Sequence, residues 1–360
     1  MSDPISTELL VICAIRNPLV VDNTIELSES CNRGAMGRTQ KLPDECGDGF
    51  PVRIARLHGV SRSRLRGRDL EAPFHGVRIL RGSTPSFRDI EDPYERQRQA
   101  RVHRARTYAP GMHQGHFFSH QTAASIWGAP LPLEFTDADE IAGYTELPLH
   151  VSAAGPTPFP RAAGITGHRT LASLTSISDQ DGLRVTSAAA TWVSLGTLPL
   201  LDVVALGDYL CRTWRQGRGR PSPGRPPLST VDELRASLDA GRRRGAARLR
   251  TAIDLIREDS WSPRETKVRC ILITAGLPEP ELNVDLFDDH GRFLGCVDMA
   301  YRHERVIVEY LGMLHGDRWA ADVERIAGLR AAGWTVIEVT SPLLKNPQEL
   351  VRRVAAALRR

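Results

Sequence analysis

Three acidic residues near the C-terminal end have the types and positions that a divalent metal ion requires. Glu265 lies in a predicted first helical turn, and Asp298 and Glu309 end apolar runs that are typical of strands. Carboxylates among apolar residues are costly unless a cation meets them, and hard oxygen ligands suit Mg²⁺ or, as its substitute, Mn²⁺. Such an ion polarises a phosphodiester and lowers the pKa of a bound water. The three acids therefore predict a metal site for phosphodiester cleavage.

Two further residues would complete the chemistry of this site. His315 follows the second strand and could act as a general base or hold the leaving oxygen, and Arg325 could bind the scissile phosphate through two hydrogen bonds. Both side chains also have structural interpretations. His315 would then be a loop residue, and Arg325 would form an ordinary helix ion pair with Asp322 or Glu324.

The acids have structural interpretations as well. Glu265 stands three residues after a predicted N-cap serine, which is the spacing of a capping box. Asp298 would instead pair with a nearby arginine, Arg302 or Arg305. Glu309 is the hardest to explain structurally, because it follows three β-branched residues in what reads as a buried strand.

The elements around the acids form one predicted domain, residues 260–360. A serine N-cap, a proline at the first helical position and a glycine stop bound its first helix, and apolar runs with a turn signal predict a hairpin. The predicted elements are a helix at 263–275, strands at 281–287, 293–301 and 305–310, a helix at 322–332, a strand at 334–339 and a helix at 347–358. This order fits the restriction-endonuclease-like fold, a mixed sheet flanked by helices.

Residues 46–106 have the pattern of a winged helix-turn-helix. A short helix ends at Gly59, Ser61 caps a second helix that carries Leu65 and Leu70, and a wing follows. A helix that enters the major groove needs donors for phosphates and guanine edges. The second helix supplies four arginines for DNA, namely Arg62, Arg64, Arg66 and Arg68. A small domain with a solvated basic helix is the alternative.

Residues 107–215 alternate helical and extended patterns and predict a middle α/β domain. A capped helix is expected at 119–128, followed by strands. His120 has no acid or nucleophile at a recognisable spacing, so we expect it to cap or to pack. His150 and His168 belong to the ends of extended segments, and we assign them no chemistry.

The remaining segments connect or precede these domains. Residues 216–230 are rich in Gly, Pro and Arg and predict a linker, and residues 231–259 predict a helical connector. Residues 1–45 have poor periodicity and many polar turn residues, so we expect them to be disordered or a mis-assigned start, with Met36 as the alternative initiator. The whole chain is thus predicted to be an α/β (α+β) protein of several domains.

The charge distribution and the cysteine content limit the possible partners and metal sites. The 360 residues have a formal net charge of only +4, but residues 53–106 hold 14 Arg against 6 acids, and residues 212–250 hold 11 Arg against 3 acids. Such blocks suit a polyanion partner such as DNA, although solvated arginines from a high-GC genome explain either block equally well. No apolar run approaches a membrane span, and the six cysteines form no Cys-x-x-Cys pair. We therefore expect a cytoplasmic protein with no membrane partner and no zinc site.

Several short motifs of residues 260–358 occur together in one family. They are Ser262-Pro263-Arg264-Glu265-Thr266, Gly276-Leu277-Pro278-Glu279-Pro280, Val297-Asp298, Val308-Glu309-Tyr310-Leu311-Gly312, His315 and Gly333-Trp334-Thr335-Val336-Ile337. As a set they resemble the domain family of unknown function related to very-short-patch-repair (Vsr) endonucleases, within the PD-(D/E)XK nuclease superfamily. The resemblance implies an endonuclease-like domain.

A weaker resemblance covers residues 50–210. It is carried by Phe50-Pro51-Val52, by Gly59-Val60-Ser61-Arg62-Ser63-Arg64-Leu65 and by residues 119–128. These residues are similar to actinobacterial proteins whose front half resembles the AbiEi-type antitoxin of abortive-infection systems, a winged helix followed by a second α/β domain. The resemblance implies DNA binding rather than catalysis.

One departure from the superfamily bears on activity. Its third motif is acid-x-Lys, and this chain has Leu311 there, which neither ligates a metal nor orients a water. Our leading hypothesis is a DNA-associated protein whose endonuclease-like domain cleaves DNA with Mg²⁺. The alternative is a non-enzymatic winged-helix regulator, or an antitoxin with a toxin partner in its operon, whose nuclease fold is degenerate. Sequence alone leaves enzyme activity and oligomeric state open.

Overall fold

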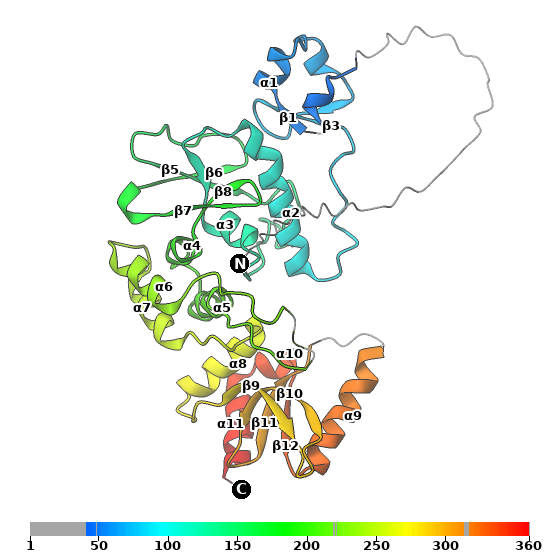
Figure 1. The fold of residues 1–360 in the computed structure, drawn as a ribbon, viewed down its shortest axis with the longest axis vertical. Coiled ribbons are helices and arrows are strands. Elements are labelled where there is room, and N and C mark those ends of the chain that lie inside the picture. The colour runs from blue at the N-terminus through cyan, green and yellow to red at the C-terminus, as the bar shows by residue number, and fades with distance from the viewer. Residues whose placement is uncertain (1–40, 48, 219, 221, 313–316, 360) are drawn as a thin grey trace, which may run out of the picture. The chain divides into compact units, whose positions relative to one another are not determined.

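Three sheets organise the chain (Figure 1). The computed structural model describes residues 41–47, 49–218, 220, 222–312 and 317–359. Most of the predicted N-terminal tail and His315 therefore lie outside the described residues. Helices alternate with the strands, so the predicted mixed α/β class is confirmed. No helix in the described part of the chain is long and apolar enough to cross a bilayer.

The first sheet is small and has the order β1-β3-β2. Its strands are β1 (Gly49–Pro51), β2 (Leu70–Glu71) and β3 (Val77–Leu80), and α1 (Val52–Leu57) follows β1 directly. Phe50, Ala55 and Leu65 are buried together in its core. The predicted short helix before Gly59 is thus confirmed, and a strand lies after the second predicted helix.

The second helix predicted for this domain is wrong. A three-residue 3-10 turn (Arg64–Arg66) stands in its place, and Leu70 lies in β2. Gly67 has an extended backbone that ends the turn, and the guanidinium of Arg64 reaches Asp69 at 2.9 and 2.6 Å. This local ion pair favours a tight turn over a continuing helix, so no recognition helix forms within residues 61–70.

The middle sheet has five strands in the order β6-β5-β4-β8-β7. Strand β5 is antiparallel to β4 and parallel to β6, so it is central to that half of the sheet. The strands are β4 (His116–Phe118), β5 (Leu149–Ala154), β6 (Ile165–Thr170), β7 (Ile177–Gln180) and β8 (Leu183–Thr186). Helices α2 (Pro93–Tyr108) and α3 (His120–Ile126) contribute Ala105, Tyr108 and Ala123 to the core beneath it.

Four more helices share one apolar core with the first helix of the C-terminal domain. They are α4 (Ala188–Ser194), α5 (Leu200–Leu210), α6 (Val231–Asp239) and α7 (Ala246–Leu255). Trp192, Leu206 and Leu234 are fully buried in this core, together with Cys270 of α8 (Pro263–Thr274). The core therefore runs from the middle region directly into α8.

The C-terminal sheet has the order β12-β11-β10-β9. Strands β9, β10 and β11 are antiparallel neighbours, whereas β11 and β12 are parallel and are connected through α9. The elements are β9 (Glu281–Phe287), β10 (Phe293–Tyr301), β11 (Val306–Tyr310), α9 (Asp317–Ala331), β12 (Thr335–Val339), α10 (Ser341–Leu344) and α11 (Pro347–Leu358). The predicted element order is confirmed, with α9 beginning earlier than expected and α10 not foreseen.

Two apolar layers cover this sheet. Val306 and Val308 face the layer that contains Val268 of α8, and Ile307 faces the layer that contains Leu329 of α9. Neighbouring residues of β11 therefore point to opposite faces, as the pleat of a strand requires. The pleat therefore places Glu309, two residues after Ile307, on the face that α9 covers.

The segment predicted as a linker packs on this sheet. The side chain of Arg220 is 6% exposed and pairs with Asp285 of β9 at 2.6 Å. It also donates to the carbonyl of Asn283 at 3.0 Å. A segment without helix or strand is thus held by a charged hydrogen bond to the edge strand.

A buried ion pair joins α5 to α8. Asp208 and Arg269 lie 2.9 Å apart, with side chains 2% and 0% exposed. Asp208 also accepts hydrogen bonds from the Thr266 hydroxyl at 2.7 Å and from the Arg257 amide at 2.7 Å. Burial raises the pKa of Asp208, and the positive charge of Arg269 opposes that shift. The pair therefore fixes α8 against the middle region.

Replacing Arg269 by methionine tests this constraint. Arg269→Met leaves Asp208 buried without its cation, and we expect the free energy of unfolding to fall by about 3–5 kcal/mol. The surface pair of Arg302 with Glu281 is the matched control, and Arg302→Ala should change stability by about 1 kcal/mol or less. Urea denaturation followed by circular dichroism measures both. Equal losses for the two variants would contradict the assigned role of the buried pair.

Candidate functional site

Strands β10 and β11 bring two of the acids close together in the C-terminal sheet. Met299 pairs with Val308 in the antiparallel register, and Asp298 and Glu309 each lie one residue beyond that pair. Glu309 lies two residues after Ile307 and therefore on the face covered by α9. The amide of Tyr310 donates a hydrogen bond to Asp298 Oδ2 at 2.8 Å, which ties the two strand ends together.

Glu265 approaches from the first turn of α8. Its Oε2 accepts hydrogen bonds from the Trp261 amide at 3.0 Å and from Asn283 Nδ2 at 3.0 Å. Ser262 Oγ accepts from the Glu265 amide at 3.2 Å, so the predicted serine cap forms. The carboxylate is buried, and burial raises its pKa while these donors lower it. Glu265 thus has a structural role at the helix start and also carries a buried charge toward β10.

The surroundings of Asp298 disfavour its ionised form. Its pKa is raised well above the ordinary value, first by burial and then by the negative charges of Glu265 and Glu309. The predicted alternative partners are engaged elsewhere: Arg302 pairs with Glu281, and Arg305 donates to the Ala332 carbonyl. Asp298 therefore has two like charges nearby and, within the described residues, no ion pair; the positive charge of Arg325, which is paired with Glu309, opposes the rise in its pKa.

Glu309 has a full partner in Arg325. The guanidinium of Arg325 meets both carboxylate oxygens, at 2.7 and 2.9 Å, and also reaches Asp322 at 3.3 Å. Glu309 is buried and Arg325 is half-buried, so this bidentate pair is partly shielded from water. The helix ion pair with Asp322, foreseen as the alternative for Arg325, is present together with the contact to the acid site.

The three acids interact but do not form a closed set of metal ligands. Among the described residues, one group of three potential ligands has its atoms within 4.8 Å of one another, and that group consists of histidines. The carboxylates of Glu265 and Glu309 are thus close enough to raise the pKa of Asp298, but the three acids do not form such a group. His315 lies outside the described residues.

Arginine and tryptophan side chains border the acid site. The guanidinium of Arg212 lies 4.0 Å from the ring centre of Trp214 and 4.6 Å from that of Trp261. Trp261 is the residue whose amide binds Glu265, and the positive charge of Arg212 opposes the rise in the pKa of Glu265. Arg220 lies 5.3 Å from the same Trp261 ring. Two largely buried cations, stacked on aromatic rings, thus lie beside the acidic cluster.

The four arginines predicted to bind DNA do not share one helix. Arg62, Arg66 and Arg68 are exposed around the 3-10 turn, whereas Arg64 is 9% exposed and paired with Asp69. The expectation of a helix presenting all four arginines is therefore wrong, because Arg64 is used to close the turn. The other three remain on the surface as a short basic loop.

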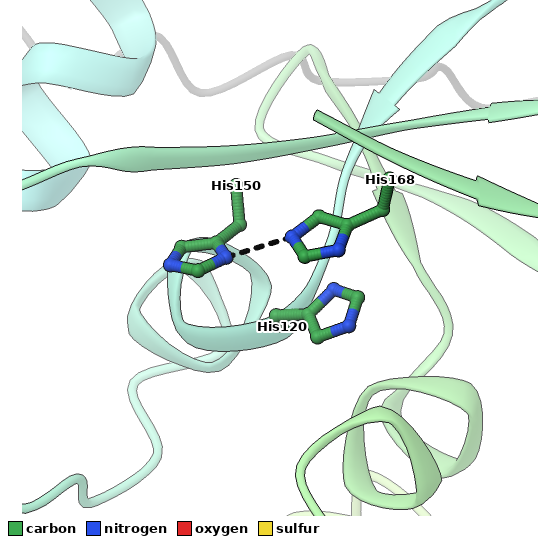
Figure 2. Close-up of side chains that lie close together, drawn as sticks. All are labelled: His120, His150 and His168. Carbon is green, nitrogen blue, oxygen red and sulfur yellow. Dashed lines mark hydrogen bonds between the residues drawn. The ribbon is translucent and has the colours of Figure 1, made fainter. Parts of the chain in front are cut away.

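A cluster of histidines in the middle sheet was missed at the level of sequence. His120, His150 and His168 lie together, and Figure 2 shows their rings gathered beside the sheet. His120 packs, as expected, with its ring stacked on that of His168 and the centres 3.7 Å apart, but its two histidine neighbours were not foreseen. The sequence signal was the alternation of apolar and polar residues in β5. It places His150 on the opposite face from the fully buried Leu149 and Val151.

Two curated proteins are similar to part of this chain. The uncharacterized proteins MT2308 and Rv2248 of Mycobacterium tuberculosis are each 30% identical to this chain over 126 residues, which is 33% of this chain and 45% of theirs. The match thus spans less than half the length of these curated relatives. No family model and no solved structure matches the chain. The relatives' names assign no activity, so only the geometry of the chain supports a function.

The charge on Asp298 predicts a specific dependence of stability on pH. A carboxyl whose pKa is raised by folding contributes stability below the ordinary Asp pKa of about 3.9, and this stability is lost as the pH rises through the folded pKa. Asp298→Asn stays neutral and keeps an acceptor for the Tyr310 amide. We expect its melting temperature to exceed that of the wild type increasingly as the pH rises from about 5 to about 8. Glu281→Gln, a surface control, should show no such divergence.

Proposed function

We propose that the chain is a DNA-associated protein whose C-terminal domain cleaves phosphodiester bonds of DNA with Mg²⁺. The observation that carries the proposal is the charge balance at Asp298, whose pKa is raised by burial and by two neighbouring acids. A divalent cation is the partner that would relieve the repulsion among all three carboxylates at once. The element order supports the proposal, because α8, antiparallel β9, β10 and β11, then α9 and the parallel β12, is the order expected of a restriction-endonuclease-like fold.

Asp298 is the residue that best supports a magnesium ion in this proposal. One oxygen of Asp298 accepts from the Tyr310 amide, and the other accepts no hydrogen bond from the described part of the chain. Mg²⁺ in proteins takes one or two carboxylates and keeps several waters. Asp298 and Glu265 would hold it, and Glu309 would join once Arg325 releases it. When bound, the ion would polarise the phosphodiester and acidify a bound water.

The chain's own cations would position the DNA. Arg325, released from Glu309, has the forked donor geometry that binds a phosphate through two hydrogen bonds. Arg212, stacked between two tryptophans, would bind a neighbouring phosphate at the edge of the site. Leu311 has no proton to transfer, so the site would lack the lysine of the superfamily's third motif. Its rate would then depend on the metal and on these arginines.

A cleavage assay tests this proposal. The full chain is incubated with supercoiled, linear and single-stranded DNA in Mg²⁺ or Mn²⁺, beside Asp298→Asn and the surface control Glu281→Gln. We expect the wild type and the control to cleave one of these forms, and Asp298→Asn to be at least about a hundredfold slower, a loss of roughly 2.7 kcal/mol of transition-state stabilisation. No cleavage by the wild type, or equal cleavage by all three proteins, would exclude the enzymatic function.

A second candidate function is favoured by the Arg325 pair. Because Arg325 already neutralises Glu309 and Leu311 replaces the lysine, the C-terminal domain would serve for contacts in a non-enzymatic DNA-binding regulator or antitoxin. The exposed Arg62, Arg66 and Arg68 would then bind phosphates from a loop rather than from a recognition helix.

Salt-dependent DNA binding separates this second candidate from a purely structural basic loop. Replacing Arg62, Arg66 and Arg68 together by alanine should weaken binding to all sequences and reduce the slope of log affinity against log salt by roughly 0.9 for each lost phosphate contact. Glu281→Gln, a surface change on the C-terminal sheet, is the control and should leave the slope unchanged. A slope that is the same in both variants and the wild type would show that the loop does not touch DNA.

A further inference from the structure

Three neighbouring strands and one helix start bring the histidine cluster together. In the parallel register of β5 and β6, His168 is directly opposite Ser152, and His150 is two residues from Ser152 on the same strand. Alternate residues of a strand share a face, so the two histidines are diagonal neighbours on one face of the sheet. Ser119 follows β4 and donates its amide to the His150 carbonyl, which places His120 beside them.

The imidazole rings are close enough to share one ion. Nδ1 of His150 and Nε2 of His168 lie 2.9 Å apart, and His120 stacks on His168 with ring centres 3.7 Å apart (Figure 2). Each histidine offers a nitrogen within 4.8 Å of the other two. Nitrogens bound to one ion at about 2.0–2.1 Å lie roughly 3.3 Å apart in tetrahedral geometry, so small turns of the rings would close the site.

The backbone and the serines hold His120 in a form suited to a ligand. His120 has φ of 51°, a left-handed conformation that costs a non-glycine residue energy and that is concentrated at functional sites. Its Nδ1 lies 2.9 Å from Ser119 Oγ, which also accepts a hydrogen bond from Ser152 Oγ at 2.7 Å. The Ser119 hydroxyl oxygen has two lone pairs, so it can accept from a protonated Nδ1 of His120 as well as from Ser152, and in that tautomer Nε2 keeps a free lone pair. A partner on the second ring nitrogen is what orients metal-binding histidines.

The charges around the cluster favour neutral ligands. Burial, followed by the charge of the neighbouring histidines, lowers the pKa of His120 and of His150 to about 3. The charged neighbours are Arg101, which is paired with Glu134 at 2.8 Å, and Arg244, which is exposed. No carboxylate belongs to the group, so a hard cation such as Mg²⁺ would find no oxygen ligand in it.

We propose that His120, His150 and His168 form a binding site for a divalent transition metal of the Zn²⁺ class. Three imidazole nitrogens within 4.8 Å of one another suit such an ion and leave one coordination position for water or for an anion, as in catalytic zinc sites. The exposed guanidinium of Arg244 would favour an anion at that position. The site replaces the expectation of no zinc, which rested on cysteine spacing and did not consider histidines from separate strands.

Metal titration of the full chain tests this site independently of DNA cleavage. Protein stripped of metal is titrated with Zn²⁺ against a chromophoric chelator, and with Co²⁺, whose visible absorption reports the ligand set. We expect one ion per chain and a tetrahedral Co²⁺ spectrum without a thiolate charge-transfer band. His150→Gln and His168→Gln should each weaken binding by at least about a hundredfold, and Ser119→Ala by about tenfold, because it removes only the orienting partner.

Two controls decide the outcome. His113→Gln changes an exposed histidine whose ring centre lies 5.0 Å from that of His116, and Glu281→Gln changes a surface acid, and both should bind Zn²⁺ as the wild type does. Zn²⁺ should also raise the melting temperature of the wild type and not that of His168→Gln. A wild type that takes up no Zn²⁺, a thiolate band with Co²⁺, or unchanged affinity in His168→Gln would each overturn the proposal. The stacked histidines would then serve packing alone.

Discussion

The buried pair of Asp208 and Arg269 is the constraint on which the C-terminal site depends. Helix α8 carries Arg269, and one turn earlier it carries Glu265. Because Asp208 binds both Arg269 and Thr266, the first half of α8 cannot rotate without leaving a charge in the apolar core. The orientation of the candidate acid site is therefore set by a residue of the middle region, more than fifty positions away in the chain.

Local compensation of charge explains how the remaining acids are arranged. Glu309 is matched by a guanidinium, and Glu265 is matched by an amide group and a backbone donor. Asp298 stands between them with a single backbone donor. The raised pKa of Asp298 has two physical causes, namely burial and the negative charges of Glu265 and Glu309. Strongly perturbed pKa values of this kind are concentrated at functional sites.

The helices and strands of the C-terminal domain could be predicted because their signals are local. The Ser262 cap, Pro263 and the positive φ of Gly276 act within a few residues, and each bounds α8 where expected. The failures involve pairs formed at a distance or hidden in a turn. Arg64 closes on Asp69 instead of extending a helix, Arg325 reaches back to Glu309, and His168 meets His150 only through the register of two strands. Sequence periodicity does not encode register, so the histidine cluster was not foreseen.

The order in which the chain is synthesised gives the buried pair a further consequence. Helix α5 leaves the ribosome before α8 exists, so Asp208 must stay hydrated until Arg269, 61 residues later, becomes available. The hairpin of β9 and β10 closes over a short turn and can form at once, whereas closing the long loop between α5 and α8 carries a larger entropic penalty. The middle region should therefore complete its core only after α8 has been synthesised, because Arg269 of α8 neutralises the buried Asp208.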